Sequence, residues 1–157
     1  MGQRIRTWDQ LHPKTHIVAS VPNNGTRSLK AILEIPEHVH FDWNFTDDLL
    51  KDFDIIHLPI RNPYAVAHSW ARSHSLAGVG PMLECYDAMF RWLKNNEHRV
   101  FVHIVENFQT REGSAPYKEM DSDVLREWRL FMQERIVLPH LAWFKRWYPR
   151  LDPTAAP

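Results

Sequence analysis

The chain has 157 residues, of which 44% are hydrophobic, and its 19 basic and 19 acidic side chains give a formal net charge of zero. This length and apolar content suit one compact domain with a buried core, which we expect over residues 1–151, followed by a disordered tail over 152–157. The neutral balance argues against a long nucleic-acid polymer as partner.

The first predicted unit is a strand, a turn and a helix. An apolar run over 15–21 predicts the strand, and a helical pattern over 26–33 follows a turn that ends at Gly25. Such a turn leaves backbone N–H groups at a helix N-terminus, where the helix dipole favours an anion. The turn lacks the G-x-x-x-x-G-K-[ST] pattern of a Walker A loop. On this segment alone it is either an anion site or a tight connection.

A second unit repeats this order further along the chain. We expect a strand over 39–43, a short helix near Thr46, a strand over 55–60 and a helix over 63–73, with Pro63 in its first turn. Arg61 then lies at the carboxyl end of a strand, which is where open α/β sheets bind ligands. An arginine fork suits a phosphate better than a lysine does.

The remaining elements complete an α/β pattern. Residues 78–80 predict a break, Pro81 a helix start, 99–105 a strand and 109–116 a polar loop, while 121–148 is helical and aromatic with an interruption at Pro139. Strands that alternate with helices predict a three-layer fold with a mostly parallel sheet and right-handed crossovers. We expect the aromatic C-terminal helices to cover the sheet, and their surplus surface could form a homodimer interface.

The single cysteine and the hydropathy pattern bear on the compartment. Cys85 lies in a helical pattern as a small buried hydrophobe, and a lone cysteine excludes intrachain disulfides. No segment approaches 18 uninterrupted apolar residues, and the N-terminus lacks the apolar region of a signal peptide. We therefore expect a cytoplasmic protein with no membrane span.

Residues 21–27, Val-Pro-Asn-Asn-Gly-Thr-Arg, together with Arg61-Asn62-Pro63 and Ser69, resemble the two phosphate motifs of the sulfotransferases that use 3′-phosphoadenosine 5′-phosphosulfate (PAPS). Segments 37–43 and 100–106 are similar to the heparan-type branch of that family. The resemblance implies a P-loop-like sulfotransferase fold and a nucleotide co-substrate, with no metal. It also implies that Arg61 and Ser69 hold the 3′-phosphate and that a late loop with Arg111 closes over the nucleotide. The 5′-phosphosulfate loop would comprise Asn23, Asn24, Gly25, Thr26, Arg27 and Ser28.

One position departs from the family pattern. The family's loop carries a lysine that bridges to the leaving phosphate, and this chain has Asn23 there. Loss of one preorganised donor costs about a hundred- to a thousandfold in rate. Arg27 or Lys30 could compensate, so Arg27 is also a catalytic candidate.

The family takes its general base from a histidine or glutamate after the loop helix. The candidates in this chain are Glu34, Glu37, His38 and His40, of which we favour His40 or His38 and then Glu37, since histidine needs little tuning to act at neutral pH. His38, His40 and Asp42 alternate along the predicted strand, so they could instead hold a divalent metal, although a solvated strand edge is the favoured alternative.

Two hypotheses follow for the function. The first is a minimal sulfotransferase that moves a sulfuryl group from PAPS to a hydroxyl or amine acceptor. The second is a catalytically weak or inactive relative that binds a nucleotide or a protein partner. The chain is shorter than usual members of the family, and the missing length would build much of the acceptor-binding wall.

Overall fold

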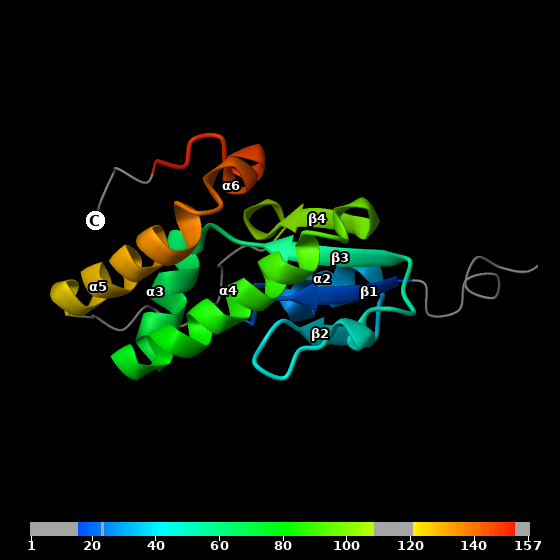
Figure 1. Ribbon diagram of the computed structural model, residues 1–157, viewed down its shortest axis with the longest axis horizontal. Coiled ribbons are helices and arrows are strands. Elements are labelled where there is room, and N and C mark those ends of the chain that lie inside the picture. Colours follow the sequence, from blue (N-terminus) through cyan, green and yellow to red (C-terminus); the bar gives the residue numbers. More distant parts are fainter. Residues whose placement is uncertain (1–15, 23, 109–120, 153–157) are drawn as a thin grey trace, which may run out of the picture.

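A computed structural model describes residues 16–22, 24–108 and 121–152. Its centre is one four-stranded sheet with the order β2-β1-β3-β4, and every neighbouring pair is parallel (Figure 1). The strands are β1 (His16–Ser20), β2 (His38–His40), β3 (Ile55–Ile60) and β4 (Val100–Ile104). The predicted parallel α/β sheet is therefore confirmed.

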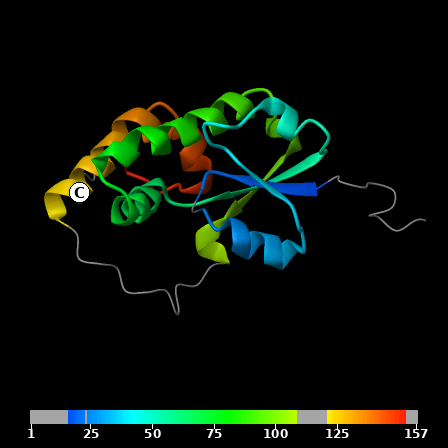
Figure 2. The same ribbon diagram turned by 90° about the horizontal axis from the view of Figure 1, so that it is seen from below.

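Helices lie on both sides of this sheet. Helix α2 covers one face and α4 the other, so the centre of the fold has three layers (Figure 2). The longer helices are α2 (Thr26–Leu33), α3 (Pro63–Ser73), α4 (Val79–Leu93), α5 (Ser122–Met132) and α6 (Leu141–Trp147). In the described part of the chain, no helix is long and apolar enough to cross a membrane.

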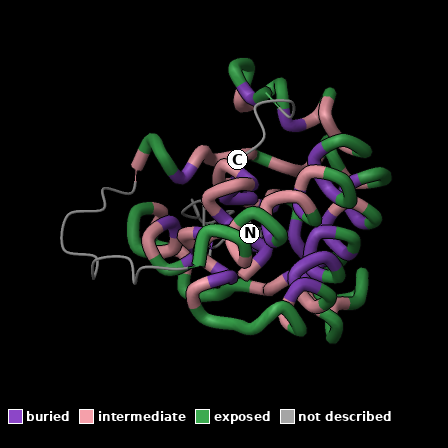
Figure 3. The backbone as a smooth tube through the Cα atoms, turned by 90° about the vertical axis from the view of Figure 1, so that its left-hand side faces the viewer, coloured by how far each residue is buried: buried purple, intermediate pink, exposed green. Residues whose placement is uncertain are grey.

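The two faces of the sheet differ in chemistry because alternate strand residues point to opposite sides. Ile17, Ile56 and Leu58 belong to the apolar face and are buried in one core with residues of α4. Figure 3 shows buried positions on the inner side of the helical turns and exposed positions outside. The opposite face carries a row of histidines: the rings of His16, His57 and His103 lie side by side across β1, β3 and β4.

The predicted bounds of α2, β3 and α3 are confirmed, and local chemistry explains them. Asn62 caps α3, since its Oδ1 accepts a hydrogen bond from Tyr64 N at 3.0 Å and Pro63 occupies the first turn. Gly25 precedes α2 with φ 74°, a left-handed conformation that glycine adopts without strain.

Two sequence-based boundaries were wrong. The strand predicted over 39–43 spans only His38–His40, because Asp42 Oδ1 accepts from Asn44 N at 2.8 Å and turns the chain. The break predicted over 78–80 is helical, since a 3₁₀ turn over Leu76–Gly78 continues directly into α4. Pro81 is tolerated there because N–H groups in the first turn need no intrahelical partner.

The C-terminal aromatic residues belong mainly to the core, as predicted. Trp128 and Phe144 are buried, and Phe144 packs edge-on against Phe90 with ring centroids 5.7 Å apart. A π-helical turn over Gln133–Val137 joins α5 to the segment before α6. Cys85 is buried, and burial raises the pKa of its thiol to about 12, which leaves an unreactive small hydrophobe.

Candidate functional site

The site lies where the direction of the chain connections reverses. From β1 the chain crosses to β2 on one side, whereas from β3 it crosses to β4 on the other. The carboxyl ends of β1 and β3 are therefore a topological switch point, the place where open parallel sheets form a ligand crevice. The turn after β1 and Arg61 after β3 flank this point.

The turn after β1 is tied to the strand by buried polar groups. Ser20 and Thr26 hydroxyls share a hydrogen bond of 2.5 Å, and both side chains are buried. Asn24 is only 2% exposed, and its Oδ1 has no hydrogen-bond partner. A buried acceptor of this kind is costly and calls for an explanation. Of the predicted loop residues, Arg27 is exposed, and Asn23 lies outside the described residues.

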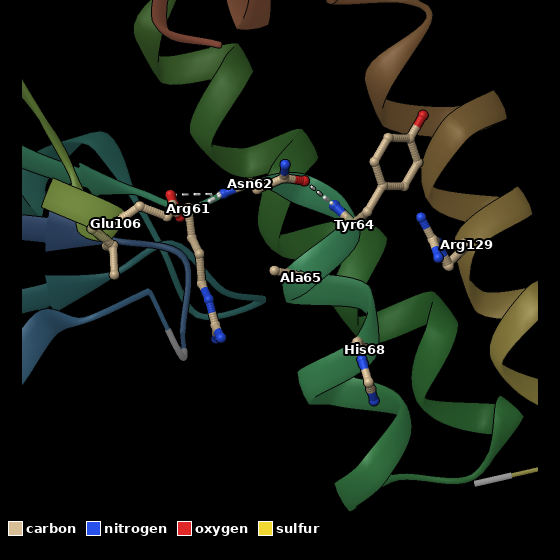
Figure 4. A pocket seen from close by; sticks show the side chains of 8 residues that line it. Arg61, Asn62, Tyr64, Ala65, His68, Glu106 and Arg129 are labelled. Atoms are coloured by element: carbon tan, nitrogen blue, oxygen red, sulfur yellow. Dashed lines mark hydrogen bonds between the residues drawn. The ribbon is translucent and has the colours of Figure 1, made fainter. Parts of the chain in front are cut away.

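Arg61 lines a cleft of about 370 Å³ that lies between α3, α5 and the end of β4 (Figure 4). Its side chain extends to the same side of α3 as Ala65 and His68, and these three residues line the cleft. In the described ranges, Arg61 forms no ion pair within 4 Å. The remaining lining residues are Asn62, Tyr64, Val105, Glu106 and Arg129.

The carboxylate of Glu106 is directed away from Arg61 by two other donors. Asn62 N donates to both carboxylate oxygens, at 3.2 and 3.3 Å, and Tyr148 Oη donates at 2.5 Å. Burial, together with the bond to Glu106, raises the pKa of Tyr148, so its hydroxyl keeps its proton. Among the described residues that line the cleft, the one carboxylate is thus bonded to other groups and forms no ion pair with Arg61.

Tyr86 of α4 has a buried hydroxyl whose pKa responds to both candidate phosphate motifs. Its side chain is fully buried, and burial raises the pKa of its hydroxyl, whereas the Asn24 amide and the charge of Arg61 lower it. Tyr86 Oη and Asn24 Oδ1 are both buried without a hydrogen-bond partner. Because β1 and β3 are adjacent and parallel, the turn after β1 and Arg61 after β3 leave the sheet side by side at the same edge.

A second cleft of about 840 Å³ adjoins the first and shares four lining residues with it. Arg129 separates the two by stacking over the Tyr64 ring, 5.2 Å from its centroid. The wall beyond it is formed by the C-terminal segment from Trp147 to Asp152. These clefts leave room beside Arg61 for a molecule larger than a single phosphate.

The three favoured candidate bases lie on or before β2, the edge strand next to β1. His40 pairs in register with Ser20 at the carboxyl end of the sheet, whereas His38 lies two residues further back and Glu37 precedes the strand. Burial lowers the pKa of His40, while Asp42 raises it and Lys30 lowers it. His40 is thus the candidate closest to the turn and is neutral near pH 7.

The side chains of His38 and Lys30 are hydrogen-bonded to each other. Lys30 Nζ donates to His38 Nδ1 at 2.8 Å, and the pKa of His38 is lowered by burial and then by Lys30. Lys30 therefore bonds to β2, whereas Arg27 is exposed at the start of α2. Ser69 lies half-buried on α3 one turn after Ala65, and Ser28 is half-buried in α2.

Some residues singled out from the sequence lie outside the part of the chain that the structure describes. Arg111 lies outside them, and so does most of the predicted C-terminal tail. Among the residues that the structure does describe, no group of three or more His, Cys, Asp or Glu side chains is arranged to hold a metal ion. Asp42 lies beyond the end of β2, so it does not continue the alternation of His38 and His40.

Several cleft residues were not singled out from the sequence. Glu106 had a usable signal, because it follows a predicted strand at the same sheet edge as Arg61. Arg129, Tyr86 and Tyr148 had none, since each reaches the site from a separate helix or from the C-terminal segment through tertiary packing.

No protein-family model matches this chain, and neither a curated protein nor a solved structure is significantly similar to it. The function is therefore inferred from the residues and the geometry of the switch point.

Proposed function

We propose that this protein is a minimal PAPS-dependent sulfotransferase of the P-loop-like type, which moves a sulfuryl group to a hydroxyl or amine acceptor. One observation carries the proposal. The turn after β1 and Arg61 after β3, the two segments that resemble the family's phosphate motifs, follow adjacent parallel strands and lie at the same switch point.

The nucleotide would lie across this point. Its 5′-phosphosulfate would accept hydrogen bonds from backbone N–H groups at the start of α2, where Gly25 allows close approach. Its 3′-phosphate would bind Arg61 and the Ser69 hydroxyl on α3.

The transfer itself needs few protein groups. The acceptor oxygen or nitrogen attacks sulfur, the bond from sulfur to the bridging oxygen breaks, and 3′-phosphoadenosine 5′-phosphate leaves with the bonding electrons. His40, neutral near pH 7, would take the acceptor's proton. Arg27 would stabilise the negative charge that develops on the leaving phosphate.

A second function has a specific observation in its favour. The family's lysine is replaced by Asn23, and Lys30 is bonded to His38 on β2. A protein with this site could bind the nucleotide and transfer no sulfuryl group. Binding and transfer therefore need separate tests.

Calorimetric titration with 3′-phosphoadenosine 5′-phosphate tests binding, with 5′-AMP as the control that lacks the 3′-phosphate. We expect micromolar binding that is selective for the bisphosphate and is abolished in Arg61→Ala. The exposed Arg91→Ala on α4 serves as the matched control and should bind normally. The assignment of Arg61 would be contradicted if the unchanged protein bound both nucleotides with equal affinity and Arg61→Ala bound them with that same affinity.

Transfer is tested with PAPS labelled in the sulfuryl group and a panel of hydroxyl and amine acceptors. Activity in the unchanged protein would mean that Arg27 suffices as the cation. Activity that appears only in Asn23→Lys would favour the nucleotide-binding alternative, with a site that is otherwise competent. No transfer by either protein would contradict the enzymatic proposal.

A further inference from the structure

We infer that the outer edge of β4 pairs with β4 of a second copy of this chain, so that the sheets of the two copies join into one continuous sheet. The two strands would run antiparallel about Val102. This edge lies at the margin of the sheet (Figure 1), whereas the proposed nucleotide site lies at the carboxyl ends of β1 and β3. The inference therefore does not depend on the proposed function.

The backbone of β4 is paired on one side only. β4 ends the strand order of the sheet and pairs with β3 from Val100 to Ile104. In the described part of the chain, the backbone of Phe101, Val102 and His103 forms hydrogen bonds with no element other than β3. Alternate residues of a strand direct their N–H and C=O groups to opposite sides, so part of this backbone points outward. An open edge of this kind is a template for another strand.

β4 lacks the features that usually keep a strand edge from pairing. Its sequence, Val-Phe-Val-His-Ile, contains no proline and no formally charged residue, which are the common means of protection. The nearest charged side chains are bonded within the chain. Arg99 donates to the carbonyl oxygens of Leu50 and Phe53, at 3.3 and 2.6 Å, and Glu106 is held by the two donors described above. The edge is therefore neutral and apolar.

The opposite edge of the sheet differs from β4. β2 has only three residues, and its His38 accepts a hydrogen bond from Lys30 Nζ at 2.8 Å. A very short strand with an ammonium group bonded to it matches the protected edges of natural sheets. Of the two edges, β4 is the one suited to pairing.

The side chains of β4 suit an identical strand. Antiparallel pairing about Val102 overlaps all five residues and places Val100 opposite the partner's Ile104, on the face that packs against the core. On the other face, Phe101 lies opposite the partner's His103. Phe101 is 59% exposed, and its ring stacks on His57 with the centroids 6.0 Å apart. A second copy would thus cover Phe101 and continue the row of aromatic rings across the two sheets.

Charge also favours an antiparallel copy as the partner. Arg99 is the charged residue nearest the N-terminal end of β4, and Glu106 is the one nearest its C-terminal end. Antiparallel pairing brings the N-terminal end of one strand beside the C-terminal end of the other. Unlike charges therefore come together at both ends, and like charges directly opposite each other, which would oppose pairing, are avoided.

Sedimentation equilibrium between about 1 and about 100 μM tests the association, and we expect a dimer whose fraction rises with concentration. Phe101→Lys places an ammonium group on the edge and removes the ring. It should raise the dissociation constant of the dimer about a hundredfold. Leu138→Lys is the matched control, because it makes the same change at a 47% exposed position between α5 and α6. It should leave the dissociation constant unchanged.

Amide hydrogen exchange tests the strand pairing itself. In the unchanged protein, protection of the amides from Phe101 to His103 should increase with protein concentration, because outward N–H groups gain partners in the dimer. In Phe101→Lys the exchange of these amides should not depend on concentration.

Three results would overturn the inference. The first is a monomer at about 100 μM. The second is a dimer that Leu138→Lys dissociates and Phe101→Lys does not, which would place the interface on the C-terminal helices. The third is a dimer whose formation leaves the exchange of the β4 amides unchanged. Should Phe101→Lys not fold, Phe101→Thr keeps a good strand former without the ring and is judged by the same two measurements. Nucleotide titration of either variant should match the unchanged protein, so failure of this inference is distinguishable from failure of the proposed function.

Discussion

The row of histidines across the sheet makes a specific prediction about acid stability. His57 Nε2 lies 3.0 Å from His16 Nδ1, and His57 Nδ1 lies 2.9 Å from His103 Nε2. A neutral imidazole has one N–H, so neutral His57 donates to one neighbour and accepts from the other. Burial, and then the charges of His103 and His16, lower its pKa from 6.5 to about 4. Folding is therefore linked to deprotonation of His57.

The sign and size of the effect follow from this difference. Below pH 6.5 the unfolded chain binds a proton that the folded protein excludes, so stability falls as the pH drops from about 6.5 to about 4 and is then constant. One pKa unit corresponds to about 1.4 kcal/mol, which sets an upper value of about 3 kcal/mol. The ring is only half-buried, and solvent screening reduces the expected loss to about 1–2 kcal/mol.

Urea unfolding at about pH 7.5 and about pH 4.5 measures this loss. His57→Gln keeps a donor and an acceptor and cannot titrate, while all carboxylates are the same in both proteins. We expect the unchanged protein to lose about 1–2 kcal/mol more than the variant between these pH values. His98→Gln, at an exposed position, should behave like the unchanged protein. The reasoning would be refuted if the unchanged protein lost less free energy of unfolding between the two pH values than His57→Gln does. That result would mean that both neighbours accept hydrogen bonds from a His57 cation.

Three further substitutions test the local structure around the site, each by the free energy of unfolding in urea. Gly25→Ala should destabilise the protein by about 1–2 kcal/mol, because alanine is strained at φ 74°. Asn62→Ala removes the cap of α3 and should cost about 1 kcal/mol; no change would mean that Pro63 alone fixes the helix start. Trp128→Ala leaves a cavity in the core and should cost about 3–5 kcal/mol, and a cost below about 1 kcal/mol would contradict its burial.

Elements that depend on local chemistry could be predicted from the sequence. The start of α3 follows from an Asn cap and a proline in the first turn. The start of α2 follows from Gly25, because glycine is favoured in the turn that precedes the helix. The position of Arg61 at a strand end also follows from the sequence, since a buried apolar run ends at Ile60. These features need no knowledge of which segments meet in space.

Features that depend on tertiary contacts could not be predicted in this way. The short strand β2 ends early because the Asp42 side chain bonds to the backbone of Asn44, and a period-2 pattern does not report such a turn. The contact of Arg129 with Tyr64 joins α5 to α3, and both α4 and β4 lie between these helices in the chain. The partner of Glu106 is a tyrosine near the end of the described chain.

The hydrogen bonds to Glu106 show why the proposed anion site would need more than its two motifs. An arginine and a glutamate at adjacent strand ends would ordinarily pair, and the pair would compete with any phosphate. In this protein the backbone N–H of Asn62, which lies next to Arg61, donates to the carboxylate, and Tyr148 donates from the opposite side. The start of α3 thus supplies both the cation and one of the donors that hold the competing carboxylate in place. Tyr148 supplies the other from the C-terminal segment, so a site that two short motifs outline in sequence depends for its free charge on a residue more than 80 positions away.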